Sequence, residues 1–181
     1  VDKLRELGFF PTPYPLAKHL VKLAGVLPGA TVLEPSAGKG NLIAAVLPIA
    51  QTTIYACERD AELRNTLQES ATRLIDSVPA LASRIRVVEC DDFMNMKASV
   101  KFDHVVMNPP FGKVGVGDHL DHVRHAFGML RDGGTLAAIL PSGVLFREDK
   151  RHREFRAWAL DHYGELAELP GGSFKESGTN V

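Results

Sequence analysis

Cysteine and long apolar runs are scarce in this sequence, and both shortages limit what the protein can be. It contains two cysteines, Cys57 and Cys90, each inside a short apolar run that is typical of a strand. Their positions follow no metal-ligand spacing, so they indicate buried thiols in a reducing compartment, and we expect no bound metal. There is no signal peptide and no apolar run long enough to cross a bilayer, so we expect a cytoplasmic protein without a membrane partner.

The chain also has little net charge. Its 21 lysines and arginines nearly balance its 22 aspartates and glutamates, so no overall basic field indicates a nucleic acid partner. Binding to a polyanion would need a local patch or a separate module. The 181 residues, 45% of them hydrophobic, predict one globular domain over 1–181. Because the chain begins at Val1 rather than at a methionine, we expect a processed or trimmed form.

Short apolar runs alternate with longer segments of helical periodicity. This alternation predicts an α/β fold, a doubly wound, Rossmann-like parallel sheet with helices on both faces. We expect its last strand to be cut at Val181. The expected strands are 31–33, 54–57, 85–90, 102–107, 135–140 and 165–169. The expected helices are one after Pro13 that Pro28-Gly29 closes, one from Asn41, one capped by Asp60, one that Gly133-Gly134 ends, and 149–162.

The most informative stretch is Asn-Pro-Pro-Phe at 108–111, directly after the apolar run 102–107. Proline cannot extend a ladder, and it holds the residue before it in an extended conformation. The Asn108 amide and the Pro109 carbonyl are therefore expected side by side, next to an aromatic ring. Two acceptors and a ring suit a planar substrate that carries an NH2 group. The alternative is a proline-rich turn after a strand.

Glycines and acids follow the other expected strands, whose carboxyl ends would meet at one rim of the sheet. Gly38 and Gly40 allow backbone N–H groups to approach a ligand closely. A dinucleotide fingerprint would need a small residue where Ile43 stands, and a P-loop would need Ser or Thr after Gly-Lys. Glu58 suits the hydroxyls of a ribose, and Asp92 suits an adenine amine. Their alternatives are a solvated helix-start carboxylate and a simple turn.

Together these motifs resemble class I S-adenosylmethionine-dependent methyltransferases of the exocyclic-amino DNA methyltransferase group, over nearly the whole chain. Phe-Phe-Pro-Thr-Pro at 9–13 resembles the group's aromatic-Thr-Pro motif, placed ahead of the glycine-rich motif as in its gamma-type order. The segment 34–40 resembles the cofactor loop, with Lys39 where the group usually has Thr or Ser. Lys39 would either pair with the cofactor's carboxylate or crowd it. Segments 121–126 and 169–179 resemble a phage- and plasmid-associated branch.

The resemblance implies S-adenosylmethionine as cofactor and DNA as partner, with methyl transfer to N6 of adenine. The target base would be flipped into the site and held by Phe111. The implied cofactor-binding residues are Phe10, Thr12, Pro13, Glu34, Pro35, Ser36, Gly38, Gly40, Glu58, Asp92, Phe93 and Asn108. The implied catalytic residues are Asn108, Pro109, Pro110 and Phe111. No target-recognition domain is visible in the sequence, so an additional recognition domain or subunit is a further possible partner.

Other functions share some of these features. Methyltransferases that act on guanine amines of RNA or on glutamine amides of proteins also carry Asn-Pro-Pro-aromatic. A non-catalytic module that binds cofactor or nucleic acid for a larger protein is a third class. Methylation of a cytosine carbon would need a cysteine nucleophile, commonly after a proline, and neither Cys57 nor Cys90 is so placed.

Three weaker patterns have two interpretations each. His119, His122 and His125 favour a partly exposed helix start over a metal site. The basic residues within 147–156 favour a solvated helix face over phosphate contacts, because acids are interspersed among them. The loop 112–117 is either a mobile gate over the target base or a plain connector.

Overall fold

The fold is seen in a computed structural model that describes residues 11–88, 90, 92–97, 99–110, 119–171 and 173–174. The chain divides into two compact units, Val1–Ile139 and Leu140–Val181. All the residues that the sequence predicts to form a site belong to the first unit. In the described part of the chain, no helix is both long and apolar enough to pass through a membrane.

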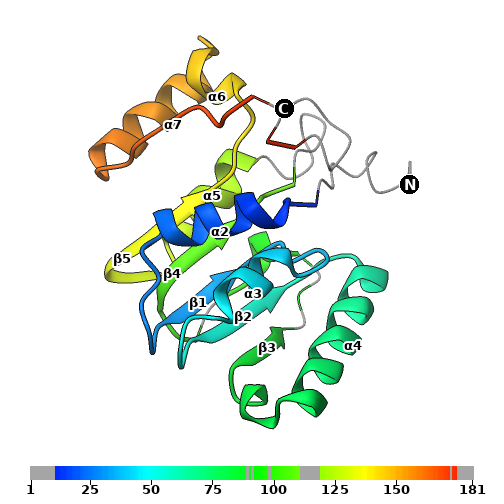
Figure 1. The fold of residues 1–181 in the computed structure, drawn as a ribbon. Coiled ribbons are helices and arrows are strands. Elements are labelled where there is room, and N and C mark those ends of the chain that lie inside the picture. The colour runs from blue at the N-terminus through cyan, green and yellow to red at the C-terminus, as the bar shows by residue number, and fades with distance from the viewer. Residues whose placement is uncertain are drawn as a thin grey trace. The chain divides into compact units, whose positions relative to one another are not determined.

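The first unit is built on a five-stranded sheet in the order β3-β2-β1-β4-β5 (Figure 1). Its strands are Thr31–Glu34 (β1), Thr53–Cys57 (β2), Ile85–Val88 (β3), Phe102–Met107 (β4) and Leu130–Ala138 (β5). Every neighbouring pair is parallel. The strand order reverses between β1 and β4, which is the position where such sheets bind ligands. The predicted α/β fold with a Rossmann-like sheet is confirmed.

Helices cover both faces of this sheet, as predicted. They are Tyr14–Leu23 (α2), Asn41–Val46 (α3), Ala61–Ser77 (α4) and His119–Phe127 (α5), with short 3-10 turns at Pro79–Leu81 and Phe93–Asn95. Helices α2 and α3 pack together on one face, and α5 covers the other (Figure 1). Right-handed crossovers explain this division, because the chain moves outward from β1 in one direction and from β4 in the other.

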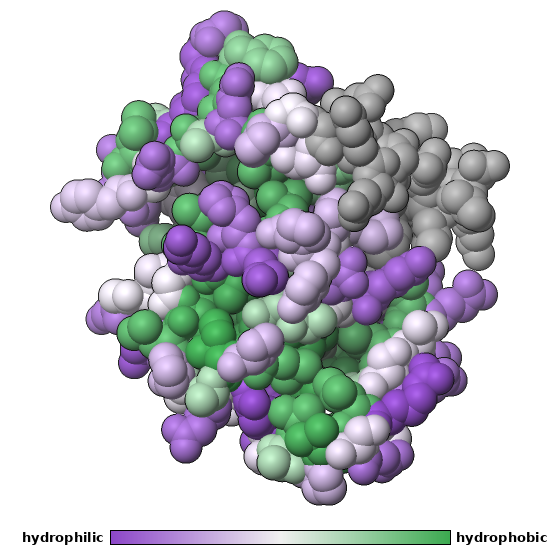
Figure 2. All heavy atoms as spheres, in the orientation of Figure 1, coloured by the Kyte–Doolittle hydropathy of each residue, from purple (hydrophilic) through white to green (hydrophobic). Residues whose placement is uncertain are grey.

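Apolar residues of the central strands form the core of the sheet. Val32, Leu33, Ile54, Val105 and Val106 are at most 1% exposed. Helices cover both faces of the central strands, which is why buried apolar residues are adjacent there and do not alternate with polar ones. On the face shown in Figure 2, polar and apolar side chains are mixed over the surface.

Helix α4 begins where the sequence predicts. The Asp60 side chain accepts a hydrogen bond from Leu63 N at 3.0 Å, which confirms the predicted cap. Leu63, Leu67 and Ala71 of its predicted apolar stripe are buried, whereas Leu74 is 37% exposed. The far end of the helix therefore extends past the part that packs on the sheet.

Helix α2 is shorter than predicted. Leu16 and Leu20 are buried as expected, but Leu23 and Leu27 are 64% and 66% exposed. The helix ends at Leu23 because Gly25 adopts the left-handed conformation, with φ of 66°. The prediction that Pro28-Gly29 closes this helix is wrong.

Strand β5 begins earlier than predicted, at Leu130 instead of Thr135. Gly133 and Gly134 therefore lie inside the strand and do not end the preceding helix. The register against β4 shifts between Phe102 and His104, so the glycines form an irregularity in the ladder. A Cβ on Gly134 would lie 2.9 Å from the Asp103 carbonyl oxygen, so this close approach requires glycine. The third strand also ends sooner than predicted, at Val88.

The second unit contains helices α6 (Gly143–Phe146) and α7 (Lys150–Asp161). Asp149 caps α7 by accepting from His152 N at 3.2 Å. Arg156 donates to the Val144 carbonyl at 3.0 Å and to the Arg147 carbonyl at 2.7 Å. Arg156 therefore caps the C-terminal end of α6.

The strand predicted at 165–169 is absent: these residues form neither strand nor helix. Leu166 and Leu169 are half-buried, and the residues around them are exposed. Their spacing of three residues does not match the two-residue alternation of a half-buried strand, which is why the prediction was wrong.

The cysteines also differ from the prediction. Cys57, at the end of β2, and Cys90, just past β3, form a disulfide across neighbouring strands. The two residues are 33 apart in sequence, so only the strand order reveals that they are neighbours. The expectation of two buried free thiols is wrong.

Reduction of this disulfide should destabilise the fold. A cross-link between residues 33 apart restricts the unfolded chain by about 3 to 4 kcal/mol in the chain-entropy model. We expect dithiothreitol to lower the free energy of unfolding in urea by this amount, and to have no effect on a Cys57→Ser, Cys90→Ser double variant. Two titratable thiols in the unreduced, denatured protein would contradict the cross-link.

Candidate functional site

The loop between β1 and α3, residues 35–40, is called the glycine loop below. Glu58, directly after β2, is hydrogen-bonded to it. Its Oε2 accepts a hydrogen bond from Gly38 N at 2.7 Å, and its Oε1 accepts one from Asp60 N at 2.8 Å. The side chain is only 7% exposed, and its bond to Gly38 N is buried, whereas its bond to Asp60 N is partly buried. Because Glu58 contacts both the loop after β1 and the start of α4, it fixes two edges of the rim relative to each other.

Gly40 makes the turn from this loop into α3. Its φ of 82° lies in the left-handed region, and it occupies the N-cap position of the helix. A Cβ at this position would come within 2.9 Å of Leu67 Cδ1. Gly40 is therefore required both by its backbone conformation and by close packing against α4. Its neighbour Lys39 is exposed.

Glu34, the last residue of β1, is a buried acid beneath the loop. It is 2% exposed, and its Oε2 has no hydrogen-bond partner among the described residues. Burial raises the pKa of Glu34 well above its ordinary value, and the nearby Glu58 carboxylate raises it further, while a hydrogen bond from the Ile43 backbone acts in the opposite direction. A positive charge brought to this rim would favour the ionised form of Glu34.

Asn108 follows β4, and both its backbone and its side chain are hydrogen-bonded. Ser36 Oγ donates to the Asn108 carbonyl oxygen at 2.9 Å, and Asn108 Nδ2 donates to Thr12 Oγ1 at 3.1 Å. Three segments that are far apart in sequence, the Thr-Pro segment, the glycine loop and the Asn-Pro-Pro segment, thus meet at one rim. The structure brings together five of the predicted site residues: Thr12, Ser36, Gly38, Glu58 and Asn108.

Asn41 is part of this arrangement, although the sequence predicted it only as a helix start. Its Nδ2 donates to the Thr12 carbonyl oxygen at 2.7 Å. Asn41 is the first residue of α3 and directly follows Gly40, so it joins the Thr-Pro segment to the glycine loop. The sequence signal for this role is that Asn41, a side-chain amide, directly follows Gly40.

Asp92 and Phe93 occupy the 3-10 turn after β3. Asp92 accepts from Met94 N at 3.0 Å. The Phe93 ring is 4% exposed and packs against two rings of α5, with centroids 5.9 Å from His122 and 4.9 Å from His125. Because His122 is 6% exposed, the expectation of a partly exposed row of histidines is wrong for this residue.

The surface near Asp92 is hollowed. The hollow, about 540 Å³, is lined by Tyr55, Val88, Cys90, Asp92, Asn95, Met96, Lys97, Ser99, Val100 and Phe102. Of the predicted site residues, Asp92 alone lies in this lining. The disulfide ties this region to the Glu58 side of the rim, because Cys57 precedes Glu58 directly and Cys90 lies two residues before Asp92.

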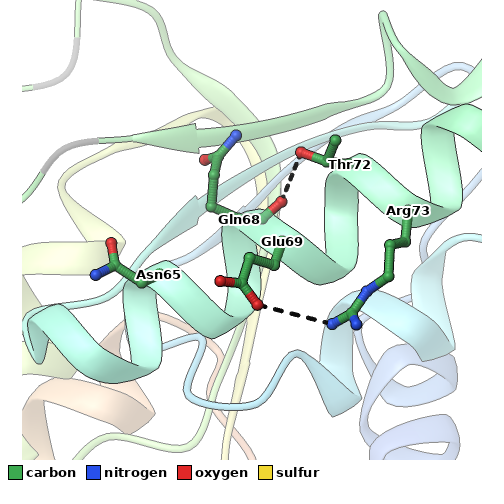
Figure 3. Close-up of a pocket in the computed structure, with 5 residues that line it drawn as sticks. All are labelled: Asn65, Gln68, Glu69, Thr72 and Arg73. Atoms are coloured by element: carbon green, nitrogen blue, oxygen red, sulfur yellow. Dashed lines mark hydrogen bonds and ion pairs between the residues drawn. The ribbon is translucent and has the colours of Figure 1, made fainter.

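A second hollow lies on the outer face of α4 (Figure 3). Its polar side chains bond within the helix: Thr72 Oγ1 donates to the Gln68 carbonyl at 2.9 Å, and Arg73 lies 4.0 Å from Glu69. No predicted site residue lines it, and its ion pair is exposed to water. This surface is therefore not the candidate site.

Phe10, Phe111 and the loop 112–117 lie outside the described residues, so their predicted roles stay predictions. The prolines that the sequence predicts at the site lie within the described residues: Pro13, Pro35 and Pro109 are buried, and Pro110 is half-buried.

Comparison with known proteins agrees with this fold. No protein-family profile matches the chain. It is 25% identical to the methylase subunit of the type I restriction enzyme StySPI of Salmonella potsdam, over 96% of the chain and 39% of that protein. The chain thus spans well under half the length of this relative.

Solved structures show the same architecture. The methyltransferase subunit of a type I restriction-modification system from Streptococcus thermophilus matches with a TM-score of 0.67 and 23% identity, over 84% of the chain and 38% of that structure. An S-adenosylmethionine-dependent O-methyltransferase from Thermotoga maritima matches with a TM-score of 0.61 and 15% identity, over 89% and 54%. The fold is therefore that of the S-adenosylmethionine-dependent methyltransferases, whose cofactor is the one that the sequence predicts.

Proposed function

We propose that this chain transfers a methyl group from S-adenosylmethionine to an exocyclic amino nitrogen, N6 of adenine in DNA. The observation that carries the proposal is the meeting of Asn108 with Thr12 and Ser36 on the rim where Glu58 holds the glycine loop. A group suited to an NH2 substrate thus lies beside a loop suited to an adenosine.

The residues of the rim fit a cationic nucleoside better than a phosphate. Two buried acids, Glu34 and Glu58, lie close enough for the charge of one to raise the pKa of the other. A phosphate would be repelled there, whereas the sulfonium and ammonium groups of S-adenosylmethionine would be attracted. Glu58 would accept from the ribose hydroxyls through its remaining lone pairs, and Asp92 from the adenine amine.

When bound, S-adenosylmethionine supplies a methyl group on a positively charged sulfur, so neither a metal nor a covalent enzyme intermediate is needed. The contribution of the chain is to position and activate the amine. An aromatic amine is a weak nucleophile because its lone pair is delocalised into the ring. Asn108 Oδ1 and the Pro109 carbonyl would each accept one N–H, which favours a pyramidal nitrogen and makes its lone pair available. Phe111 would stack on the base that carries this amine.

DNA is the favoured substrate class for two reasons. The chain resembles exocyclic-amino DNA methyltransferases in the order of its motifs, and two of the proteins that it is similar to are methylase subunits of type I restriction systems. Methylation of a cytosine carbon is disfavoured, because Cys57 and Cys90 are joined to each other and no other cysteine exists. Because the chain spans 39% of the methylase subunit that it resembles, we propose that a recognition domain or subunit completes target selection.

Two measurements on the purified chain test this function. Calorimetry should detect binding of S-adenosylmethionine and no binding of NAD, because the rim is acidic. Tritiated methyl groups should then appear in unmethylated DNA, and not in ribosomal RNA or in a total protein extract. Label in RNA or protein alone would show that this molecule, and not DNA, is the substrate. Binding without any transfer would favour a non-catalytic module.

A further inference from the structure

The hydroxyl of Thr12 contacts the side chain that the proposed chemistry depends on. Thr12 is 6% exposed, and its Oγ1 accepts a hydrogen bond from Asn108 Nδ2 at 3.1 Å. The two residues are separated by 96 positions in the sequence. The resemblance implies only that Thr12 binds the cofactor, so its hydrogen bond to the Asn108 amide indicates a second role for Thr12.

The orientation of an asparagine amide decides what it offers a substrate. The planar amide has a donor, Nδ2, at one edge and an acceptor, Oδ1, at the other edge. Donation from Nδ2 to Thr12 turns Oδ1 of Asn108 away from Thr12. If the amide rotated by half a turn, Nδ2 would replace Oδ1, and a donor would face the N–H donors of the target amine.

Thr12 is itself held firmly enough to set this orientation. Its carbonyl oxygen accepts from Asn41 Nδ2 at 2.7 Å. The next residue, Pro13, has φ of −56° and is the N-cap residue of α2, and its carbonyl accepts from Ala17 N at 2.9 Å. The backbone of Asn108 is fixed separately, by Ser36 Oγ at 2.9 Å. The hydrogen bond from Asn108 Nδ2 to the Thr12 hydroxyl restrains the amide torsion of Asn108.

We infer that Thr12 is a positioning residue, whose hydroxyl holds the Asn108 amide with its acceptor oxygen available to the target amine. This inference rests on the proposed function, and it concerns how Asn108 is aligned rather than which cofactor binds. A small misalignment of a reacting group lowers rates strongly while binding is retained.

Thr12→Val tests this role, because valine has nearly the same shape and lacks the hydroxyl. We expect kcat for methyl transfer to fall about tenfold to a hundredfold, with the Kd for S-adenosylmethionine changed less than about threefold. Thr12→Ser keeps the hydroxyl and should restore most of kcat. A loss of cofactor affinity in Thr12→Val with kcat unchanged would overturn the inference and assign Thr12 to the cofactor.

A second measurement does not depend on activity. In the 15N-labelled protein, the side-chain NH2 signal of Asn108 is identified by its disappearance in Asn108→Asp. We expect its protons to exchange with solvent about tenfold faster in Thr12→Val than in wild type or Thr12→Ser. Equal exchange in all three proteins would overturn the inference. If exchange responds as expected while no substrate accepts a methyl group, the proposed function fails and the alignment of Asn108 by Thr12 stands.

Discussion

With Asn108 replaced by alanine, we expect kcat for methyl transfer to fall by about a thousandfold, while the affinity for S-adenosylmethionine changes less than about threefold. The change removes the acceptor that would bind the target amine. It leaves the Asn108 carbonyl, to which Ser36 Oγ donates at 2.9 Å, so the glycine loop keeps its anchor. Calorimetry and single-turnover transfer measured on the same protein separate the two effects.

Asn108→Asp provides the matched comparison. It keeps an oxygen at the acceptor position and loses the donation from Nδ2 to Thr12. We expect its kcat to lie between those of wild type and Asn108→Ala. Loss of cofactor binding in either variant would contradict the division of roles, in which Asn108 serves the amine and the loop serves the cofactor.

Replacement of Glu58 by alanine should have the opposite pattern, with the main loss in cofactor affinity. Two backbone groups, Gly38 N and Asp60 N, would lose a charged partner at 2.7 and 2.8 Å, and the ribose would lose its acceptor. Hydrogen bonds to charged groups contribute about 1.5 to 3 kcal/mol each, so we expect the Kd for S-adenosylmethionine to rise by about a hundredfold or more.

Glu62→Ala is the control for this variant. Glu62 lies in the first turn of α4, carries the same charge and is exposed. Its removal tests whether the effect arises from the specific contacts of Glu58 or from the general charge at this helix start. We expect the Kd to change less than about twofold for Glu62→Ala. Equal losses of affinity in the two variants would show that Glu58 acts only through its charge.

Features set by neighbouring residues were predictable from the sequence. Strand β4 has the predicted bounds, Phe102–Met107, because its apolar Val-Val-Met end is followed closely by two prolines, which cannot extend the ladder. The Asp60 cap was predictable for the same reason, since it depends on an acid directly before a helical pattern. The positions of the glycine loop and of Glu58 follow from the order of these elements.

Features set by contacts between distant segments were not predictable. The disulfide depends on β2 and β3 being neighbours, and the contact of Thr12 with Asn108 depends on where α2 packs. Likewise, Gly133 suggested a helix end, because glycine in the left-handed conformation commonly ends helices. Gly133 does adopt this conformation, but the pairing of β5 with β4 places it in a strand. Phe93 packs under α5, a partner that no local pattern indicates.

The most direct test of the central claim is the position of the transferred methyl group. The chain would be incubated with unmethylated DNA and S-adenosylmethionine that carries a trideuterated methyl group, and the digested nucleosides would be analysed by mass spectrometry. We predict the label on N6 of adenine, with none in the Asn108→Ala reaction. Label on C5 of cytosine, or equal label with and without the Asn108 side chain, would contradict the account.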